Sequence, residues 1–179
     1  VLIGLGFSTF LGFFLALGVM VALYHLLRHS RRATVRGIFG RLQILSSAFM
    51  AFSHGSNDGQ KFMGVFALAL VLGGVYDQFV IPIWVILLLG LVMGLGTAFG
   101  GWRIIRTMGF QLTKLEPVNG FAAESSAGLA ITLATSLGIP VSTTHTINTA
   151  IMGVGATRRF SAVRWGVTRN IVTAWVLTF

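Results

Sequence analysis

Two long stretches of the chain are apolar throughout. Residues 1–27 and 81–102 contain no Asp, Glu, Lys or Arg. A helix needs about 20 apolar residues to cross the roughly 30 Å hydrocarbon layer of a bilayer, and both stretches are long enough. The pattern therefore predicts membrane-spanning helices at these two positions.

A third apolar segment, residues 42–72, is interrupted in its middle by polar residues. Residues 53–61 read Ser-His-Gly-Ser-Asn-Asp-Gly-Gln-Lys. Because glycine is a weak helix former and Ser, Asn and Asp favour caps and turns, we expect the helix to break between Gly55 and Gly59. A solvated loop at the membrane surface is the alternative. Asp58 is the strongest single candidate for a functional residue, because an acid within an apolar segment is costly to bury.

A fourth apolar region is interrupted between residues 137 and 141. Residues 118–137 and 141–156 meet at Gly-Ile-Pro, and the second stretch gives only about 24 Å of helix. We therefore expect a re-entrant helical hairpin rather than two full spans. Pro140 is followed by Ser142, Thr143 and Thr144, a pattern typical of a helix start. Capping alone would explain one hydroxyl, whereas several donors at a helix N-terminus favour an anion site for phosphate or sulfate.

Two acids within the apolar segments are candidate cation ligands. Asp58, with the amide oxygen of Asn57 and carbonyl groups freed by a helix break, would suit Na⁺ or a proton. Lys61 is either its counter-ion or an anion ligand. Glu124 is the second candidate, unless it pairs with a loop arginine. His54 lies four residues before Asp58, where a hydrogen-bonding role is more ordinary than metal binding.

Composition and charge agree with a membrane protein. The chain is 55% apolar and only 9% charged, whereas a soluble domain has about 25% charged residues. Lysines and arginines cluster at residues 28–41, 103–114 and 158–169, each beside an apolar segment. Basic loops face the cytoplasm, so these clusters should lie inside and the loop 73–82 outside. The net charge of +9 therefore reflects orientation in a membrane and not nucleic-acid binding. The absence of cysteine excludes disulfides and thiolate metal sites.

Four motifs, in this order, are similar to those of the inorganic phosphate transporter family, the sodium- and proton-coupled phosphate permeases. They are His-Gly-Ser-Asn-Asp-Gly-Gln-Lys-Phe-Met-Gly at residues 54–64, Gly-Phe-Ala-Ala-Glu at residues 120–124, Gly-Ile-Pro-Val-Ser-Thr-Thr-His-Thr at residues 138–146, and the segment 163–172. The resemblance covers nearly all of the chain from Arg41 onward.

The resemblance implies an all-α membrane protein. It would have transmembrane helices, a broken helix and a re-entrant helical hairpin, which together form one half of an inverted-repeat transporter. Each motif occurs once, so residues 1–179 are expected to be a single membrane domain, the C-terminal repeat of a larger transporter, truncated at both ends. The expected location is the cell membrane, with multiple passes.

The function implied by the resemblance is symport of inorganic phosphate with Na⁺ or H⁺, without catalytic residues. The residues expected near phosphate are Asn57, Gln60, Ser142, Thr143 and Thr144. Those expected to couple the cation are Asp58, Glu124 and Asn57, with no metal other than Na⁺ at the two acids and no other cofactor. The expected partners are phosphate, the cation, the lipid bilayer, the N-terminal repeat of the same protein and, as an option, a second copy in a homodimer.

Other functions are left open. A sulfate permease of the same fold would use the same donors, because both anions are tetrahedral. An intramembrane phosphotransfer enzyme would need more clustered acids than Asp58 and Glu124 to hold Mg²⁺. A passive channel or an assembly subunit would not need buried carboxylates.

Overall fold

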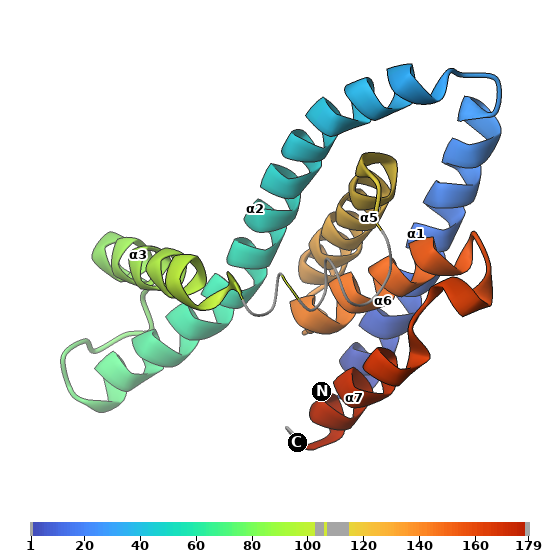
Figure 1. The fold of residues 1–179 in the computed structure, drawn as a ribbon. Helices are drawn as coiled ribbons and strands as arrows, with labels where there is room; N and C mark the ends of the chain where they lie inside the picture. Colours follow the sequence, from blue (N-terminus) through green and yellow to red (C-terminus); the bar gives the residue numbers. More distant parts are fainter. Residues whose placement is uncertain (1, 103–105, 107–114, 178–179) are drawn as a thin grey trace.

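The computed structural model describes residues 2–102, 106 and 115–177. All regular structure in these described residues is helical, which confirms the predicted all-α class. The elements are α1 (Leu2–Leu27), α2 (Arg32–Leu72), α3 (Ile83–Gly100), α5 (Pro117–Ser136), α6 (Thr143–Ala156), the 3₁₀ turn η2 (Phe160–Ala162) and α7 (Trp165–Leu177). Figure 1 shows the hairpin of α5 and α6 lying between α1 and α2.

Helices α1 and α3 carry the apolar stretches predicted to span a membrane. Among the described residues, Gly4–Leu27 and Ile83–Gly100 are long and apolar enough to do so. Many of their large apolar side chains are exposed, such as Phe10 at 67% and Leu87 at 66%. Apolar surface of this extent is unusual on a protein surrounded by water.

The predicted break in the third apolar segment is wrong. Helix α2 continues through Gly55 and Gly59 and has 41 residues, a length of about 60 Å. The surface-loop alternative is wrong for the same reason. Ser53 and Asn57 are buried, and both bond to hydroxyls of α5, while the Ser53 hydroxyl also bonds to Phe49 O one turn earlier in α2. Packing against α5 outweighs the penalty of about 1 kcal/mol for each glycine in the helix.

Helices α2 and α5 run in the same direction, because the residue numbers of their hydrogen-bonded partners increase together along the two helices. The pairs are Ser46 with Glu124, Ser53 with Thr132, and Asn57 with Thr135. Helices α1 and α6 are also parallel. Gly12 faces Thr146 and Thr149, and Tyr24 bonds to Arg158 further along. The hairpin therefore starts and ends at the end of the fold where α1 joins α2.

Glycines allow the hairpin to approach its neighbours closely. A Cβ atom at Gly12 of α1 would lie 2.7 Å from Thr146 O, and one at Gly128 of α5 would lie 2.6 Å from the Phe49 ring of α2. Gly153 of α6 similarly faces the α1 backbone. Small residues at such crossings are typical of helix packing in membranes.

The hairpin tip is built from local sequence signals. Gly138 adopts a positive φ of 68°, which ends α5, and Ile139 N donates to Ala134 O at 2.9 Å. This is a Schellman motif, in which glycine takes the left-handed position. Pro140 and Val141 follow, and Ser142 caps α6. The predicted boundary between the two arms of the hairpin is confirmed.

Two of the three basic clusters lie at the open end of the hairpin or beside it. Residues 28–41 form the turn between α1 and α2 and the first turns of α2, and Arg158 follows α6. The cluster 103–114 lies outside the described residues except for Arg106. The loop with Asp77 joins α2 to α3 at the far end of α2.

Candidate functional site

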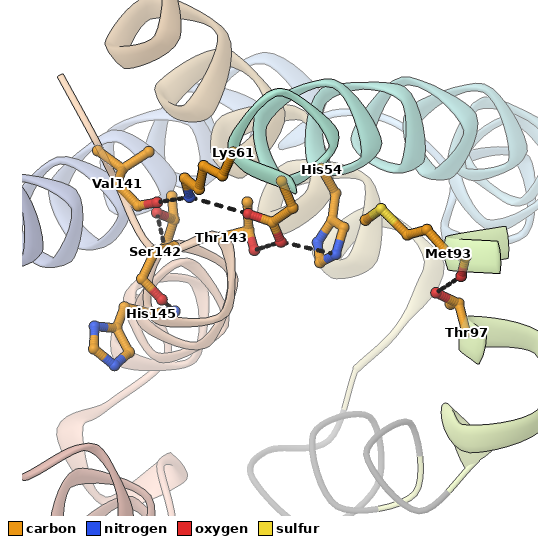
Figure 2. A network of polar contacts seen from close by, with 10 residues as sticks. His54, Lys61, Met93, Thr97, Val141, Ser142, Thr143 and His145 are labelled. Atoms are coloured by element: carbon orange, nitrogen blue, oxygen red, sulfur yellow. Dashed lines mark hydrogen bonds and ion pairs between the residues drawn. The ribbon is translucent and has the colours of Figure 1, made fainter. Parts of the chain in front are cut away.

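The tip of the hairpin meets the polar run of α2. The Thr143 hydroxyl donates to Asp58 Oδ2 at 3.1 Å, and Lys61 Nζ donates to Asp58 Oδ1 at 3.1 Å and to Val141 O at 2.8 Å (Figure 2). We call Asp58, Lys61, Val141, Ser142 and Thr143 the tip site. The two polar interruptions of the sequence are therefore in direct contact in the fold.

The unbroken helix is what aligns the α2 side of the tip site. Positions three or four apart share a face of a helix, so His54, Asp58 and Lys61 project together. Lys61 is the counter-ion of Asp58, which was one of its two predicted roles. His54 Nε2 lies 3.4 Å from Asp58 Oδ2, as expected for a hydrogen-bonding histidine.

The α6 side of the tip site is a helix N-terminus. Ser142 is the N-cap residue, and its hydroxyl accepts from His145 N at 3.4 Å. The first backbone bond of the helix runs from Thr146 N to Ser142 O. The amides of Thr143 and Thr144 precede that bond and have no partner within the helix. They present a partial positive charge to whatever lies before α6.

The charges at the tip site are nearly balanced. The side chain of Asp58 is 24% exposed and that of Lys61 is 45% exposed, so both reach solvent on one side. The Lys61 ammonium group lies beside the carbonyl that precedes the N-cap of α6. An oxyanion at this position would meet the ammonium group, free amides and hydroxyl donors, but would be repelled by Asp58 unless a cation neutralised that carboxylate.

The other residues expected near phosphate, Asn57, Gln60 and Thr144, do not belong to the tip site. Asn57 is buried, and its Nδ2 donates to Thr135 Oγ1 at 2.7 Å, while its Oδ1 has no partner among the described residues. Gln60 is exposed and lies about 200° around α2 from Asp58. Thr144 is exposed next to the buried Thr143. The structure thus brings Thr143 into contact with Asp58 and leaves Ser142 as the cap of α6 beside it, whereas Gln60 points away from this place.

Glu124 lies in a separate place. Its Oε2 accepts from Ser46 Oγ at 2.5 Å, and Ser46 precedes Asp58 by twelve residues, or about 18 Å along α2. The two acids therefore cannot bind the same ion. Among the described residues, Glu124 forms no ion pair with an arginine, which was the alternative role considered for it. Arg158 pairs with Glu116 instead.

The sequence interpretation missed the polar seam between α2 and α5. Ser46, Thr132 and Thr135 were not singled out, although each bonds a residue of the other helix. A signal was present, since positions 124, 132 and 135 fall on one face at helical spacing, as do 46, 53 and 57. The break expected in α2 concealed the second of these patterns.

The described part of the chain contains no group of three or more His, Asp or Glu residues able to hold a metal ion. His54 and Asp58 stand as a pair. A divalent cation with a substrate phosphate usually needs more oxygen ligands than this pair supplies.

The whole chain, residues 1–179, matches the sequence profile of the Phosphate transporter family. The chain belongs to this family. This confirms the resemblance stated from the motifs, and a member of the phosphate transporter family is a membrane protein.

Relatives of this chain within the phosphate transporter family include proteins from bacteria, from a plant and from Pyrococcus abyssi. A probable low-affinity inorganic phosphate transporter of Rhizobium meliloti is 47% identical over 96% of this chain and 52% of its own length. A protein of Bacillus subtilis with the same name is 40% identical over 84% of this chain and 46% of its own length. The chloroplastic inorganic phosphate transporter 2-1 of Arabidopsis thaliana is 41% identical over 80% of this chain and 25% of its own length.

A solved structure, described as the sodium-dependent phosphate transporter, is similar to this chain with a TM-score of 0.70 and 36% identity. The similarity covers 88% of this chain and 40% of that protein. The chain spans about half the length of the bacterial relatives described above. Its helices therefore correspond to part of a larger family fold.

Proposed function

We propose that the protein carries inorganic phosphate across a membrane together with a cation, and that the tip site binds the phosphate. The names of the relatives support phosphate as the substrate. The observation that carries the proposal is the position of Lys61, whose Nζ lies 2.8 Å from Val141 O at the start of α6. A cation, a helix N-terminus and hydroxyl donors thereby converge on one point.

Phosphate suits this set of donors. Free amides at a helix N-terminus bind anions, and hydroxyl groups add donors without burying further charge. Thr143 Oγ1 and Lys61 Nζ both donate to Asp58 in this structure. A phosphate bound at the tip site would need these same donors, and so it would compete with the Asp58 carboxylate.

This competition offers a physical basis for coupling. A proton or Na⁺ on Asp58 would weaken its hold on Lys61 and Thr143, and would release both donors to phosphate. The buried Asn57 Oδ1, which lacks a partner among the described residues, is an oxygen suited to Na⁺. Coupling also answers an energetic need, because each negative charge moved into an inside-negative cell costs about 2.3 kcal/mol per 100 mV. Glu124 would serve a second cation position, about 18 Å away along α2.

We further propose that the chain is the C-terminal repeat of an inverted-repeat transporter that passes the cell membrane several times. The hairpin would be re-entrant, since both of its ends lie beside the basic turn between α1 and α2. This chain aligns with about half the length of its bacterial relatives, as expected for one of two repeats. The N-terminal repeat would then complete the phosphate site.

The test is uptake of labelled phosphate by the full-length protein in proteoliposomes. An imposed Na⁺ or H⁺ gradient should drive accumulation, and the gradient that does so identifies the cation. Unlabelled sulfate serves as the competitor: strong competition together with faster sulfate uptake would make the protein a sulfate permease. Absence of uptake of either anion under both gradients would refute the proposal.

A further inference from the structure

A cavity lined by basic residues lies at the opposite end of the hairpin from the tip site. This cavity of about 790 Å³ opens between the end of α1, the start of α2 and the start of α5. We call it the basic cavity. Helix α5 has 20 residues, so its start lies about 30 Å from the tip. The basic cavity is therefore separate from the proposed phosphate site.

Three arginines line the basic cavity. Arg32 and Arg36 come from successive turns of α2, and Arg158 follows α6. Glu116 is the acid in this lining, and its Oε1 accepts from Arg158 Nη2 at 2.9 Å. Arg158 also donates to the Tyr24 hydroxyl at 3.3 Å. Glu116 is thus paired with Arg158, while Arg32 and Arg36 have no acidic partner among the described residues.

Membrane orientation alone does not require this arrangement. The orientation rule asks for basic residues in a cytoplasmic loop, and Arg164 and Arg169 satisfy it without lining this cavity. The positive charges of Arg32 and Arg36 therefore lie at the basic cavity without a neutralising acid among the described residues.

Apolar side chains make up most of the rest of the basic cavity lining. Met20 is 1% exposed, and Leu27, Val35 and Val118 line the cavity with it. A small hydrated anion would gain nothing from this apolar lining. An amphipathic anion would place its charged group against the arginines and its hydrocarbon against the apolar side chains.

We propose that the basic cavity binds a phosphate group, either the headgroup of an anionic phospholipid or free phosphate. The apolar lining favours the lipid. Clusters of Lys and Arg beside membrane helices attract anionic headgroups, and basic pockets between helices bind them specifically. The inference does not depend on the transport function proposed for the tip site.

The test uses the full-length protein in detergent and measures its binding of fluorescent phosphatidylglycerol. The Arg32→Gln/Arg36→Gln variant should bind it at least tenfold more weakly, from the contribution of each arginine near an anionic headgroup. The matched control is Arg164→Gln/Arg169→Gln, which removes the same charge elsewhere and should retain binding. All four arginines are exposed, and equal thermal unfolding midpoints would show that both variants are folded. Equal loss in both variants, or loss in neither, would overturn the proposal.

Inorganic phosphate distinguishes the two sources of the ligand. If millimolar phosphate displaces the lipid from the unaltered protein, and binds the Arg32→Gln/Arg36→Gln variant more weakly, the cavity takes free phosphate. If phosphate does not displace a lipid whose binding depends on these arginines, the ligand is the headgroup. Phosphatidylcholine binding as tightly as phosphatidylglycerol would contradict a site for anions.

Discussion

Replacing Asp58 with asparagine tests the tip site most directly. The shape of the side chain is nearly kept, but the charge and one acceptor oxygen are lost. In the structure the two oxygens of Asp58 face three donors, at 3.1 Å from Thr143 and Lys61 and at 3.4 Å from His54. Asparagine can accept from one side only, and its amide hydrogens would then face a donor on the other side.

The size of the effect follows from these contacts. A hydrogen bond to a charged partner contributes about 1.5–3 kcal/mol, and a partly exposed ion pair contributes at most about 1 kcal/mol. Asp58 and Lys61 are both partly exposed, which favours the lower ends of these ranges. A loss of about 2 kcal/mol would weaken the attachment of the hairpin tip to α2 about 30-fold. The variant is also neutral at every pH, so it cannot release Lys61 in response to a cation.

The expected result is loss of gradient-driven accumulation of labelled phosphate in proteoliposomes that contain equal amounts of inserted protein. Asp77→Asn is the matched control, since Asp77 is an exposed acid in the α2–α3 connection. It should accumulate phosphate like the unaltered protein. If Asp58→Asn accumulates phosphate as well as Asp77→Asn does, Asp58 has no part in coupling, and the proposed competition for Lys61 is refuted.

Three further predictions concern other contacts. Thr143→Val should raise the half-saturating phosphate concentration about tenfold, because a donor to Asp58 and to phosphate is lost, whereas Thr97→Val on α3 should not change it. Gly153→Ala should lower the free energy of unfolding by about 1–3 kcal/mol, because a Cβ would overlap the α1 backbone; Gly18→Ala, where the space is open, should not, and equal unfolding midpoints would contradict this packing. Glu116→Gln should lower stability by about 0.5–1 kcal/mol through its lost pair with arginine, with a smaller loss at high salt; a loss independent of salt would argue against the ion pair.

The features that were predicted correctly from the sequence depend on residues that lie close together along the chain. The lengths of α1 and α3 follow from uninterrupted apolar residues. The end of α5 and the start of α6 follow from Gly138, Pro140 and Ser142, because a positive φ, a missing amide hydrogen and a capping hydroxyl each act within a few residues. The family could also be recognised from short motifs, and the match to the whole chain confirms it.

Helix α2 shows where local reasoning failed. Its glycines and short polar residues favour a break, and in an isolated segment they would oppose a helix. In the fold, Ser53 and Asn57 find hydroxyl partners on α5, so the continuous helix leaves few polar groups unsatisfied. The energetic balance depends on a neighbour about eighty residues away, which no window of sequence contains.

The sequence by itself determined which segments are apolar, where the hairpin turns and which polar residues are candidates for a site. Only the tertiary structure decided which of those residues meet. The parallel docking of α5 on α2 brings Thr143 to Asp58 across 85 positions and leaves Glu124 beside Ser46, about 18 Å away along α2. The physical reason is that helical periodicity fixes the face on which a side chain lies, whereas the direction and register of two packed helices depend on how all of their contacts fit together.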